Sequence, residues 1–201
     1  SLKDKVDVLT SALGQKRFSE VARELKKNGF AQGIVSLLYG YPGTGKTATV
    51  HEIARQTKRD ILQVDISNIK DMFVGESEKR LKEVFKEYRK AKKILSAAPI
   101  LLFNEADALI GNRIEVNHSV DQMYNSMQNI LLEELEKFDG IFFATTNLIN
   151  NMDDAFNRRF LYKVEFYKPS YAVRKKIWET KLKNVPNSWY GKLADFDLTG
   201  A

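Results

Sequence analysis

The segment Gly40 to Thr47, GYPGTGKT, constrains the fold more than any other stretch of the chain. It matches the pattern G-x-x-x-x-G-K-[ST] in full. A short apolar run, Ile34 to Tyr39, precedes it, and a segment with helical character, Lys46 to Lys58, follows it. Glycines let a loop in this position curl until its backbone N–H groups point at phosphate oxygens in front of a helix N-terminus. The segment therefore predicts a phosphate-binding strand–loop–helix unit, and with it an α/β fold.

The rest of the chain alternates short apolar runs with longer runs that repeat apolar residues at helical spacing. This alternation is typical of a parallel sheet with helices on both faces, so we predict a three-layer α/β/α fold around a five-stranded parallel sheet. The predicted strands are 34–39, 61–66, 99–103, 141–146 and 161–166, and the predicted helices are 17–28, 46–58, 75–93, 120–138 and 172–182. The run 99–103 is apolar throughout, as expected of a strand covered on both faces, whereas 161–166 alternates like a partly exposed edge strand.

The length of the chain suggests one domain and part of another. A chain of 201 residues can form one domain with a sizeable core. We assign residues 1–167 to the α/β core with an N-terminal helix, and residues 168–201, opened by Pro169 and Ser170, to the start of a helical unit. Because the chain begins with Ser1 rather than Met and ends on DLTGA, we expect it to be a fragment of a longer protein.

Composition excludes several classes of protein. The sequence has no Cys, which excludes disulfides and thiolate metal sites. Its longest apolar run, Ala97 to Phe103, is far shorter than the ~20 residues of a membrane-spanning helix, and we find no signal peptide. We therefore expect a cytoplasmic protein with no membrane segment in this chain. The stretch HEIAR, His51 to Arg55, lacks the second His of the H-E-x-x-H motif, which excludes that zinc-protease site.

The net charge of +6 and the isoelectric point of about 9.3 permit binding to nucleic acid or to acidic partners. However, Lys and Arg are interleaved with Asp and Glu, as in EKRLKEVFKEYRKAKK from Glu78 to Lys93. That arrangement is typical of a solvated helix face. The charge alone therefore does not indicate a nucleic-acid partner.

Within the glycine-rich loop, Lys46 provides a positive charge for the outer phosphates of a nucleotide. The Thr47 hydroxyl is placed to bind Mg²⁺. We therefore predict that the ligands are ATP or ADP with Mg²⁺. The residues predicted to contact the nucleotide are Pro42, Gly43, Thr44, Gly45, Lys46, Thr47 and Ala48.

Two polar residues, Asn104 and Glu105, end the apolar run in the stretch LLFNEADAL. A strand end of this kind lies at the sheet edge where open α/β folds bind ligands. Glu105 can orient and deprotonate an attacking water, which makes it the predicted catalytic base. Asn104 can accept a hydrogen bond from a metal-bound water through its carbonyl oxygen, but it adds no negative charge to the metal site. We expect Asp107 to be a helix cap or an ion-pair partner rather than a metal ligand.

Two further polar segments follow. In ATTN, Asn147 ends an apolar strand and would reach the same sheet edge, where it can hydrogen-bond the γ-phosphate or the attacking water. An isolated Asn at a strand end is otherwise a common turn residue. In NRRF, Arg158 and Arg159 precede the last predicted strand. They are either surface charges or residues that reach the nucleotide of a neighbouring subunit, where such an arginine accelerates phosphoryl transfer by roughly 10³–10⁵-fold.

Together these four segments resemble the AAA+ ATPase family, in the family's order and over about Gly33 to Phe166. GYPGTGKT corresponds to Walker A, ILLFNE to Walker B, the Asn of ATTN to sensor 1 and the RR of NRRF to the arginine-finger pair. The resemblance implies a P-loop NTPase core with strand order 5-1-4-3-2, assembly into a ring that is usually hexameric, and ATP-driven, chaperone-like remodelling of macromolecules. The catalytic residues it implies are Lys46, Glu105, Asn147, Arg158 and Arg159.

The resemblance also suggests roles for residues 72–75 and for the segment that begins at about Pro169. In AAA+ proteins that act on polypeptides, an aromatic–hydrophobic–glycine step after the second strand forms the pore loop that grips substrate. The residues at that position are Met72, Phe73, Val74 and Gly75. Without the resemblance, Phe73 would be a core or interface aromatic. The family's helical lid would follow from about Pro169, and the chain ends at the Gly200–Ala201 step, near which the lid normally contributes a sensor 2 residue.

Three functions remain open from the sequence. The leading hypothesis is an ATP-hydrolysing AAA+ module that remodels or translocates protein substrates. The second is a nucleotide switch that binds without hydrolysis, because Asn104 weakens the metal site; the presence of Glu105, Asn147 and both arginines argues against it. The third is a DNA-acting relative such as a loader or helicase component. The positive charge permits this function, but the pore-loop-like residues around Phe73 favour a polypeptide substrate.

Overall fold

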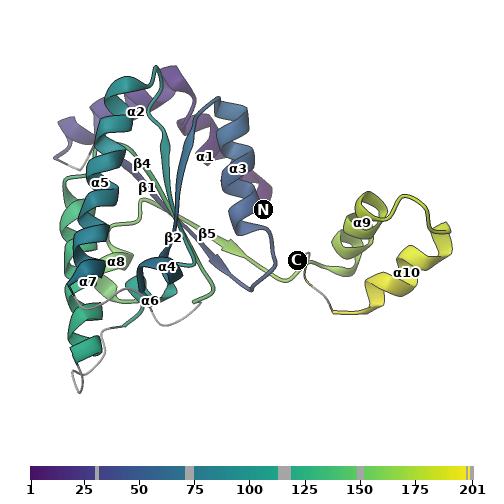
Figure 1. Ribbon diagram of the computed structural model, residues 1–201. Coiled ribbons are helices and arrows are strands. Elements are labelled where there is room, and N and C mark those ends of the chain that lie inside the picture. The colour runs from purple at the N-terminus through teal and green to yellow at the C-terminus, as the bar shows by residue number, and fades with distance from the viewer. Residues whose placement is uncertain (30–31, 71–74, 113–118, 149–151, 198, 200–201) are drawn as a thin grey trace.

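A five-stranded parallel sheet in the order β2-β3-β4-β1-β5 forms the centre of the molecule (Figure 1). The computed structural model describes residues 1–29, 32–70, 75–112, 119–148, 152–197 and 199. The strands are β1 (Ile34–Gly40), β2 (Ile61–Asp65), β3 (Ile100–Asn104), β4 (Ile141–Thr146) and β5 (Tyr162–Phe166). Read in reverse, this order is the predicted 5-1-4-3-2. The prediction of a P-loop NTPase α/β fold is therefore confirmed.

Helices cover both faces of the sheet, as predicted. They are α1 (Leu2–Ala12), α2 (Gln15–Lys27), α3 (Lys46–Thr57), α4 (Ile66–Lys70), α5 (Glu76–Ile94), α6 (Asp107–Ile110), α7 (Ser119–Glu136), α8 (Asp154–Asn157), α9 (Tyr171–Lys181) and α10 (Asn187–Asp195). The predicted helices correspond to α2, α3, α5, α7 and α9. The sequence interpretation missed α1, although Ser1 and Asp4 form a capping box at its start. No helix of the described residues is long and apolar enough to cross a membrane.

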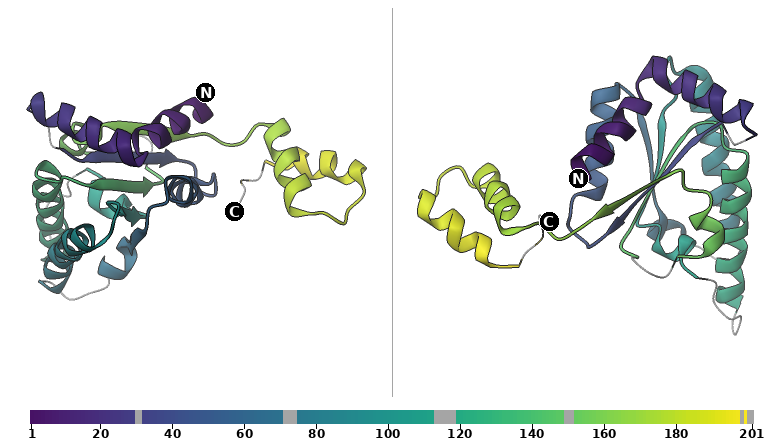
Figure 2. Two further views of the ribbon diagram at one scale, coloured as in Figure 1. Left: turned by 90° about the horizontal axis from the view of Figure 1, so that it is seen from above. Right: turned by 180° about the vertical axis from the view of Figure 1, so that it is seen from behind.

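Alternate side chains of the central strands enter two separate apolar cores. In β3, Ile100 and Leu102 pack with α1, α2 and α3, whereas Leu101 and Phe103 pack with α5 and α7 on the other face. All four are fully buried, which explains why this strand is apolar throughout. The views from above and behind show the same three layers (Figure 2).

Tyr88 of α5 connects β3 and β4, the strands that lead to Asn104 and Asn147. Its hydroxyl donates to the Pro99 carbonyl oxygen at 2.9 Å and accepts from the Ile141 N–H at 2.9 Å. Pro99 immediately precedes β3, and Ile141 is the first residue of β4. Burial raises the pKa of the Tyr88 hydroxyl, so it remains protonated and can serve as both donor and acceptor. The contact joins the amino ends of β3 and β4, and the ladder between these strands continues from there toward their carboxyl ends.

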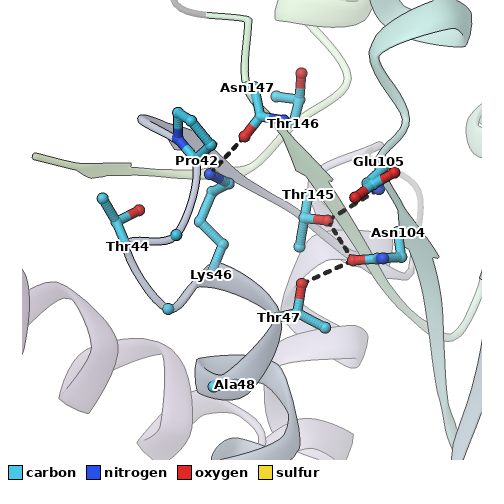
Figure 3. Close-up of a pocket in the computed structure, with 12 residues that line it drawn as sticks. Pro42, Thr44, Lys46, Thr47, Ala48, Asn104, Glu105, Thr145, Thr146 and Asn147 are labelled. Carbon is cyan, nitrogen blue, oxygen red and sulfur yellow. Dashed lines mark hydrogen bonds between the residues drawn. The ribbon is translucent and has the colours of Figure 1, made fainter. Parts of the chain in front are cut away.

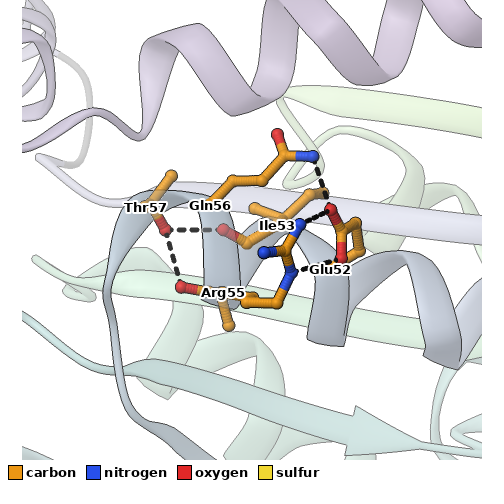
Figure 4. Close-up of polar contacts among 6 residues, drawn as sticks. Glu52, Ile53, Arg55, Gln56 and Thr57 are labelled. Carbon is orange, nitrogen blue, oxygen red and sulfur yellow. Dashed lines mark hydrogen bonds and ion pairs between the residues drawn. The ribbon is translucent and has the colours of Figure 1, made fainter.

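Polar contacts on the outer surface of α3 support the helix that follows the glycine-rich loop (Figure 4). Arg55 donates from two nitrogens to the Glu52 carboxylate at 2.8 and 2.7 Å, and Gln56 donates to it at 2.7 Å. The hydrogen bonds from Arg55, and then from Gln56, lower the pKa of the Glu52 carboxyl to about 2. Pairs at this spacing stabilise a helix only modestly. The packing of buried Val50 and Ile53 against the sheet contributes more to holding α3 in place.

Gly40 ends β1 where the backbone of β5 passes very close. Its φ is +129°, and a Cβ at this position would lie 2.1 Å from the Phe166 carbonyl oxygen. We predict that Gly40→Ala lowers the free energy of unfolding by at least about 3 kcal/mol, since both the backbone conformation and the contact become unfavourable. Urea unfolding followed by circular dichroism measures this change. Gly29→Ala is the control, because Gly29 also has positive φ but a Cβ there meets nothing within 4 Å; equal losses in the two variants would contradict the role of the close contact.

The C-terminal helices α9 and α10 pack on each other and stand apart from the sheet (Figures 1 and 2). Arg174 joins this pair by donating to the Ala194 carbonyl oxygen at 2.8 Å and to the Pro169 carbonyl oxygen at 2.9 Å. Tyr190 donates to the Leu182 carbonyl oxygen at 2.6 Å. The division of the chain at residue 168 remains our assignment, and this arrangement is compatible with it.

Candidate functional site

The carboxyl ends of β1, β3 and β4 meet at a pocket of about 330 Å³ (Figure 3). Its lining includes the whole predicted loop segment and the predicted polar strand ends. The lining residues are Pro42, Gly43, Thr44, Gly45, Lys46, Thr47, Ala48, Asn104, Glu105, Thr145, Thr146 and Asn147. Thr145 and Thr146 are the two lining residues that the sequence interpretation did not predict. Three segments far apart in the chain are therefore brought to one place.

The loop between β1 and α3 exposes backbone N–H groups at the start of a helix. Gly45 is the N-cap of α3 and has a left-handed conformation with φ of +92°, which glycine adopts without strain. The Thr44 hydroxyl donates to the Tyr41 carbonyl oxygen at 2.7 Å and braces the loop. A helix N-terminus carries a partial positive charge and unpaired N–H groups, so this end of the pocket suits a phosphate.

Lys46 is the main cationic group of the pocket and is only 8% exposed. Its ammonium donates to the carbonyl oxygens of Gly40 and Tyr41 at 2.9 and 2.7 Å and to Asn147 Oδ1 at 2.9 Å. Burial lowers the pKa of Lys46, and the nearby carboxylates of Asp107 and Glu105 act in the opposite direction. The contact with Asn147 connects the first and third predicted segments directly.

Thr47 and Asn104 also meet in the pocket. The Thr47 hydroxyl donates to Asn104 Oδ1 at 2.7 Å. Because the single hydroxyl proton is directed at Asn104, the lone pairs of the Thr47 oxygen remain available to a cation. Asn104 thus orients Thr47 through its carbonyl oxygen, without contributing a negative charge.

Glu105 lies in a turn that β4 holds in position. Its φ is +55°, a conformation uncommon for residues other than glycine. Its N–H donates to Thr145 Oγ1 at 3.2 Å, and the following N–H, from Ala106, donates to the Thr145 carbonyl oxygen at 2.8 Å. The Glu105 side chain is exposed and lines the pocket (Figure 3).

Asp107 has a different contact from the one we expected. It lies in the first turn of α6, whose N-cap is Ala106, and its Oδ1 accepts a hydrogen bond from the Asn147 N–H at 3.0 Å. Asp107 therefore supports the backbone of Asn147. The expectation of a helix cap or an ion pair did not include this contact between the start of α6 and the residue that follows β4.

The oxygen atoms of the pocket fit Mg²⁺ that is held largely by phosphates. The Thr47 hydroxyl, the Asn104 carbonyl oxygen and the Glu105 carboxylate are hard oxygen donors, which Mg²⁺ prefers. Within the described residues there is no group of three or more His, Cys, Asp or Glu side chains that could hold a metal ion by itself. Mg²⁺ at nucleotide sites is commonly bound through one or two carboxylates, several waters and the phosphates, so a sparse set of protein ligands is compatible with it.

Residues 36–168 match the model of the family described as "ATPase family associated with various cellular activities (AAA)". The chain belongs to this AAA ATPase family. It is 32% identical over 153 residues to the Cell division cycle protein 48 homolog of Archaeoglobus fulgidus, covering 75% of this chain and 20% of that protein. It is 31% identical over 170 residues to the Proteasome-activating nucleotidase of Sulfurisphaera tokodaii, an alignment that covers 79% of this chain and 41% of that protein. It is 33% identical over 159 residues to the 26S proteasome regulatory subunit 7 homolog of Saccharomyces cerevisiae, an alignment that covers 74% of this chain and 32% of that protein.

The chain thus spans between 20% and 41% of the length of these three relatives. The predicted membership of the AAA+ ATPases is confirmed, and membership implies a nucleotide-binding module. The matched range contains the entire pocket lining.

The two arginines of this AAA module lie outside the pocket. Arg158 is the C-cap of α8, and its Nε donates to the Asp154 carbonyl oxygen at 3.4 Å. Arg159 forms an ion pair with Glu136 of α7. Both arginine side chains are exposed and neither lines the pocket around Lys46. Within one subunit the structure therefore does not bring them to the predicted nucleotide.

The predicted pore loop of the AAA module falls mostly outside the described residues. Met72, Phe73 and Val74 are among the residues that the structure does not describe. Gly75 is described: it is the N-cap of α5, it is exposed, and its φ is +92°. The role of these residues as a pore loop remains a prediction.

Thr145 and Thr146 are pocket residues that the sequence interpretation missed. The signal that identifies Thr145 is strand alternation: it shares a face with Ile141 and Phe143, which pack toward α3. In the register of β3 and β4, Phe103 lies beside Ala144, so the next pair brings Thr145 beside Asn104. The predicted strand order makes these two strands neighbours, and the position of Thr145 follows once their register is known.

Proposed function

We propose that this chain is the ATP-hydrolysing module of a larger AAA protein that works as a hexameric ring, the usual form in the family, and remodels or translocates protein substrates. The observation that carries the proposal is the meeting of Lys46, Thr47, Asn104, Glu105 and Asn147 in one pocket beside a helix N-terminus. These side chains supply a cation, a hydroxyl for the metal site, a candidate base and an amide at one sheet edge.

Each side chain has a part in this proposal. The loop N–H groups and Lys46 hold the phosphates of ATP, and Asn147, which accepts a hydrogen bond from Lys46, contacts the γ-phosphate or the attacking water. Glu105 orients and deprotonates that water. Thr47 would hold Mg²⁺, and Asn104, whose carbonyl oxygen accepts hydrogen bonds from the Thr47 and Thr145 hydroxyls, would orient the Thr47 hydroxyl for that role. The metal, when bound, neutralises negative charge that develops on the phosphates.

Action on polypeptides is favoured over action on DNA. Two relatives are named for the proteasome: the Proteasome-activating nucleotidase and the 26S proteasome regulatory subunit 7 homolog. The aromatic step at Phe73 is the feature of this chain that would grip a peptide. The positive charge is interleaved with acidic residues, which gives DNA binding little support.

A nucleotide switch without hydrolysis is the second candidate, and Asn104 is the observation that favours it. An amide leaves the metal site with one negative charge fewer than a carboxylate would. Weaker binding of Mg²⁺ is the expected consequence, and hydrolysis would then need more Mg²⁺.

Steady-state ATP turnover across a range of Mg²⁺ concentrations tests the proposal. We expect Mg²⁺-dependent turnover, and we expect Lys46→Met to weaken ATP binding at least about 30-fold because it removes a buried charged group. The control is Lys86→Met, since Lys86 is an exposed residue of α5 away from the pocket. Binding without turnover at any Mg²⁺ concentration would support the switch, and unchanged binding by Lys46→Met would contradict the nucleotide site.

A further inference from the structure

Thr145 is a buried residue of β4 that makes three hydrogen bonds to the end of β3 and to the turn that follows it. Its hydroxyl donates to Asn104 Oδ1 at 2.9 Å and accepts the Glu105 N–H at 3.2 Å. Its carbonyl oxygen accepts the Ala106 N–H at 2.8 Å. The residue is only 2% exposed. One side chain therefore contacts both residues of the Asn104–Glu105 pair and holds the turn that carries them (Figure 3).

The contact with Asn104 matters because an amide has two different ends. A carboxylate presents oxygen whichever way it is rotated, whereas an Asn side chain presents either an oxygen or an NH₂ group. If the NH₂ group of Asn104 faced Thr47, the Thr47 hydroxyl would accept instead of donate, and one of its lone pairs would be lost to a cation. The orientation of the amide therefore decides whether both lone pairs of the Thr47 oxygen, or only one of them, are available to a metal.

The hydrogen bonds around Asn104 favour the orientation in which its carbonyl oxygen, rather than its NH₂ group, faces Thr47. Asn104 Oδ1 accepts from two hydroxyls, Thr47 at 2.7 Å and Thr145 at 2.9 Å. The Thr145 oxygen already accepts from Glu105, and its own proton is satisfied by the Asn104 carbonyl oxygen. Rotating the amide by half a turn would leave that buried proton without this acceptor, which carries a free-energy cost. The Thr145 hydroxyl thus keeps the Asn104 oxygen directed at Thr47.

We propose that Thr145 is a positioning residue that allows an asparagine to serve in this metal site. It acts through Asn104, whose amide it orients toward Thr47, and through Glu105, whose backbone it holds. This inference rests on the proposed function, since it concerns the site for Mg²⁺ and ATP. It assigns to Thr145 no direct contact with substrate.

A double-mutant cycle tests the inference in the full-length protein. Thr145→Val removes the hydroxyl at nearly constant volume, and Asn104→Asp replaces the amide by a group with two equivalent oxygens. The measured quantity is the Mg²⁺ concentration for half-maximal binding of a fluorescent ATP analogue, with ATP turnover recorded alongside. Binding reports on the metal site whether or not the protein hydrolyses ATP.

We expect Thr145→Val to raise this Mg²⁺ concentration roughly tenfold when residue 104 is Asn, because the amide loses its orienting partner. In the Asn104→Asp background we expect Thr145→Val to raise this Mg²⁺ concentration by less than about threefold, because a carboxylate presents oxygen in either orientation. Thr145→Ser keeps the hydroxyl and should retain most of the wild-type Mg²⁺ dependence.

Ser36→Ala is the matched control, because Ser36 is a buried hydroxyl of β1 for which the described residues offer no hydrogen-bond partner. It should leave the Mg²⁺ dependence unchanged. Thermal unfolding checks the fold of every variant, and Thr145→Ala repeats the cycle if valine disturbs packing. Equal effects of Thr145→Val in the two backgrounds, or no rescue by serine, would overturn the inference. Failure of the wild-type protein to hydrolyse ATP while binding it with Mg²⁺ would contradict the proposed hydrolysis alone.

Discussion

Replacing Glu105 by glutamine is expected to lower ATP turnover by about 10³-fold, within the range typical of a lost general base. The substitution keeps the size of the side chain and removes only its ability to accept a proton. Glu105 is exposed, and its N–H contact with Thr145 is made by the backbone, so the variant should fold normally. Nucleotide affinity should change little, because Lys46 and the loop N–H groups are proposed to hold the phosphates.

Turnover and nucleotide binding are measured separately on the same Glu105→Gln preparation. Glu133→Gln serves as the control, since Glu133 is an exposed carboxylate of α7 that pairs with Lys137. We expect it to have wild-type turnover. Turnover of Glu105→Gln within tenfold of the wild type would contradict the assignment of the base. A large loss of affinity together with turnover would indicate that Glu105 acts mainly in binding.

Arg158→Ala is expected to lower turnover by about 10³-fold in the assembled ring, the lower end of the effect of an arginine supplied by a neighbouring subunit. The structure favours Arg158 over Arg159 for this role. Arg159 is paired with Glu136 of α7, whereas Arg158 donates to a backbone carbonyl oxygen of its own short helix, that of Asp154. We expect Arg159→Ala to resemble Glu136→Ala and to affect chiefly stability, because each removes the same ion pair.

Mixing subunits separates action within one subunit from action between two. An Arg158→Ala subunit retains its own Glu105, and a Glu105→Gln subunit retains its own Arg158. If Arg158 acts on the neighbour, mixed rings contain sites with both groups, and turnover should exceed that of either variant alone. Absence of this gain in rings shown to contain both subunits would contradict action in trans. A greater loss in Arg159→Ala than in Arg158→Ala would reverse the assignment between the two arginines.

Much of the pocket was predictable because its parts are local in sequence. GYPGTGKT predicts a loop and a helix start from glycine conformation and from the positions of Lys46 and Thr47. Asn104, Glu105 and Asn147 each follow an apolar strand, and the carboxyl ends of parallel strands share one edge of the sheet. These two rules suffice to bring the segments together, and the structure places them in one pocket. Their catalytic roles remain predictions that the experiments above address.

Other features depended on which strands are neighbours. The contacts from Thr145 to Asn104 and from Asp107 to Asn147 join residues 40 or more positions apart, and each requires the pairing of β3 with β4. The short helices α4, α6 and α8 have four or five residues and too little periodicity to be recognised. The ion pair between Arg159 and Glu136 likewise forms only because α7 and the segment after α8 meet in the folded chain.

The sequence by itself determined the parallel α/β architecture, the phosphate loop and the types of polar side chain at the strand ends, because periodicity and glycine-rich motifs act over a few residues. The family resemblance supplied the strand order, which the structure confirms. Only the tertiary structure decided how Asn104 is oriented, since two hydroxyls from different elements, Thr47 of α3 and Thr145 of β4, meet at its carbonyl oxygen. An amide has an oxygen end and an NH₂ end, and the choice between them is made by neighbours that the sequence places 41 or more residues away.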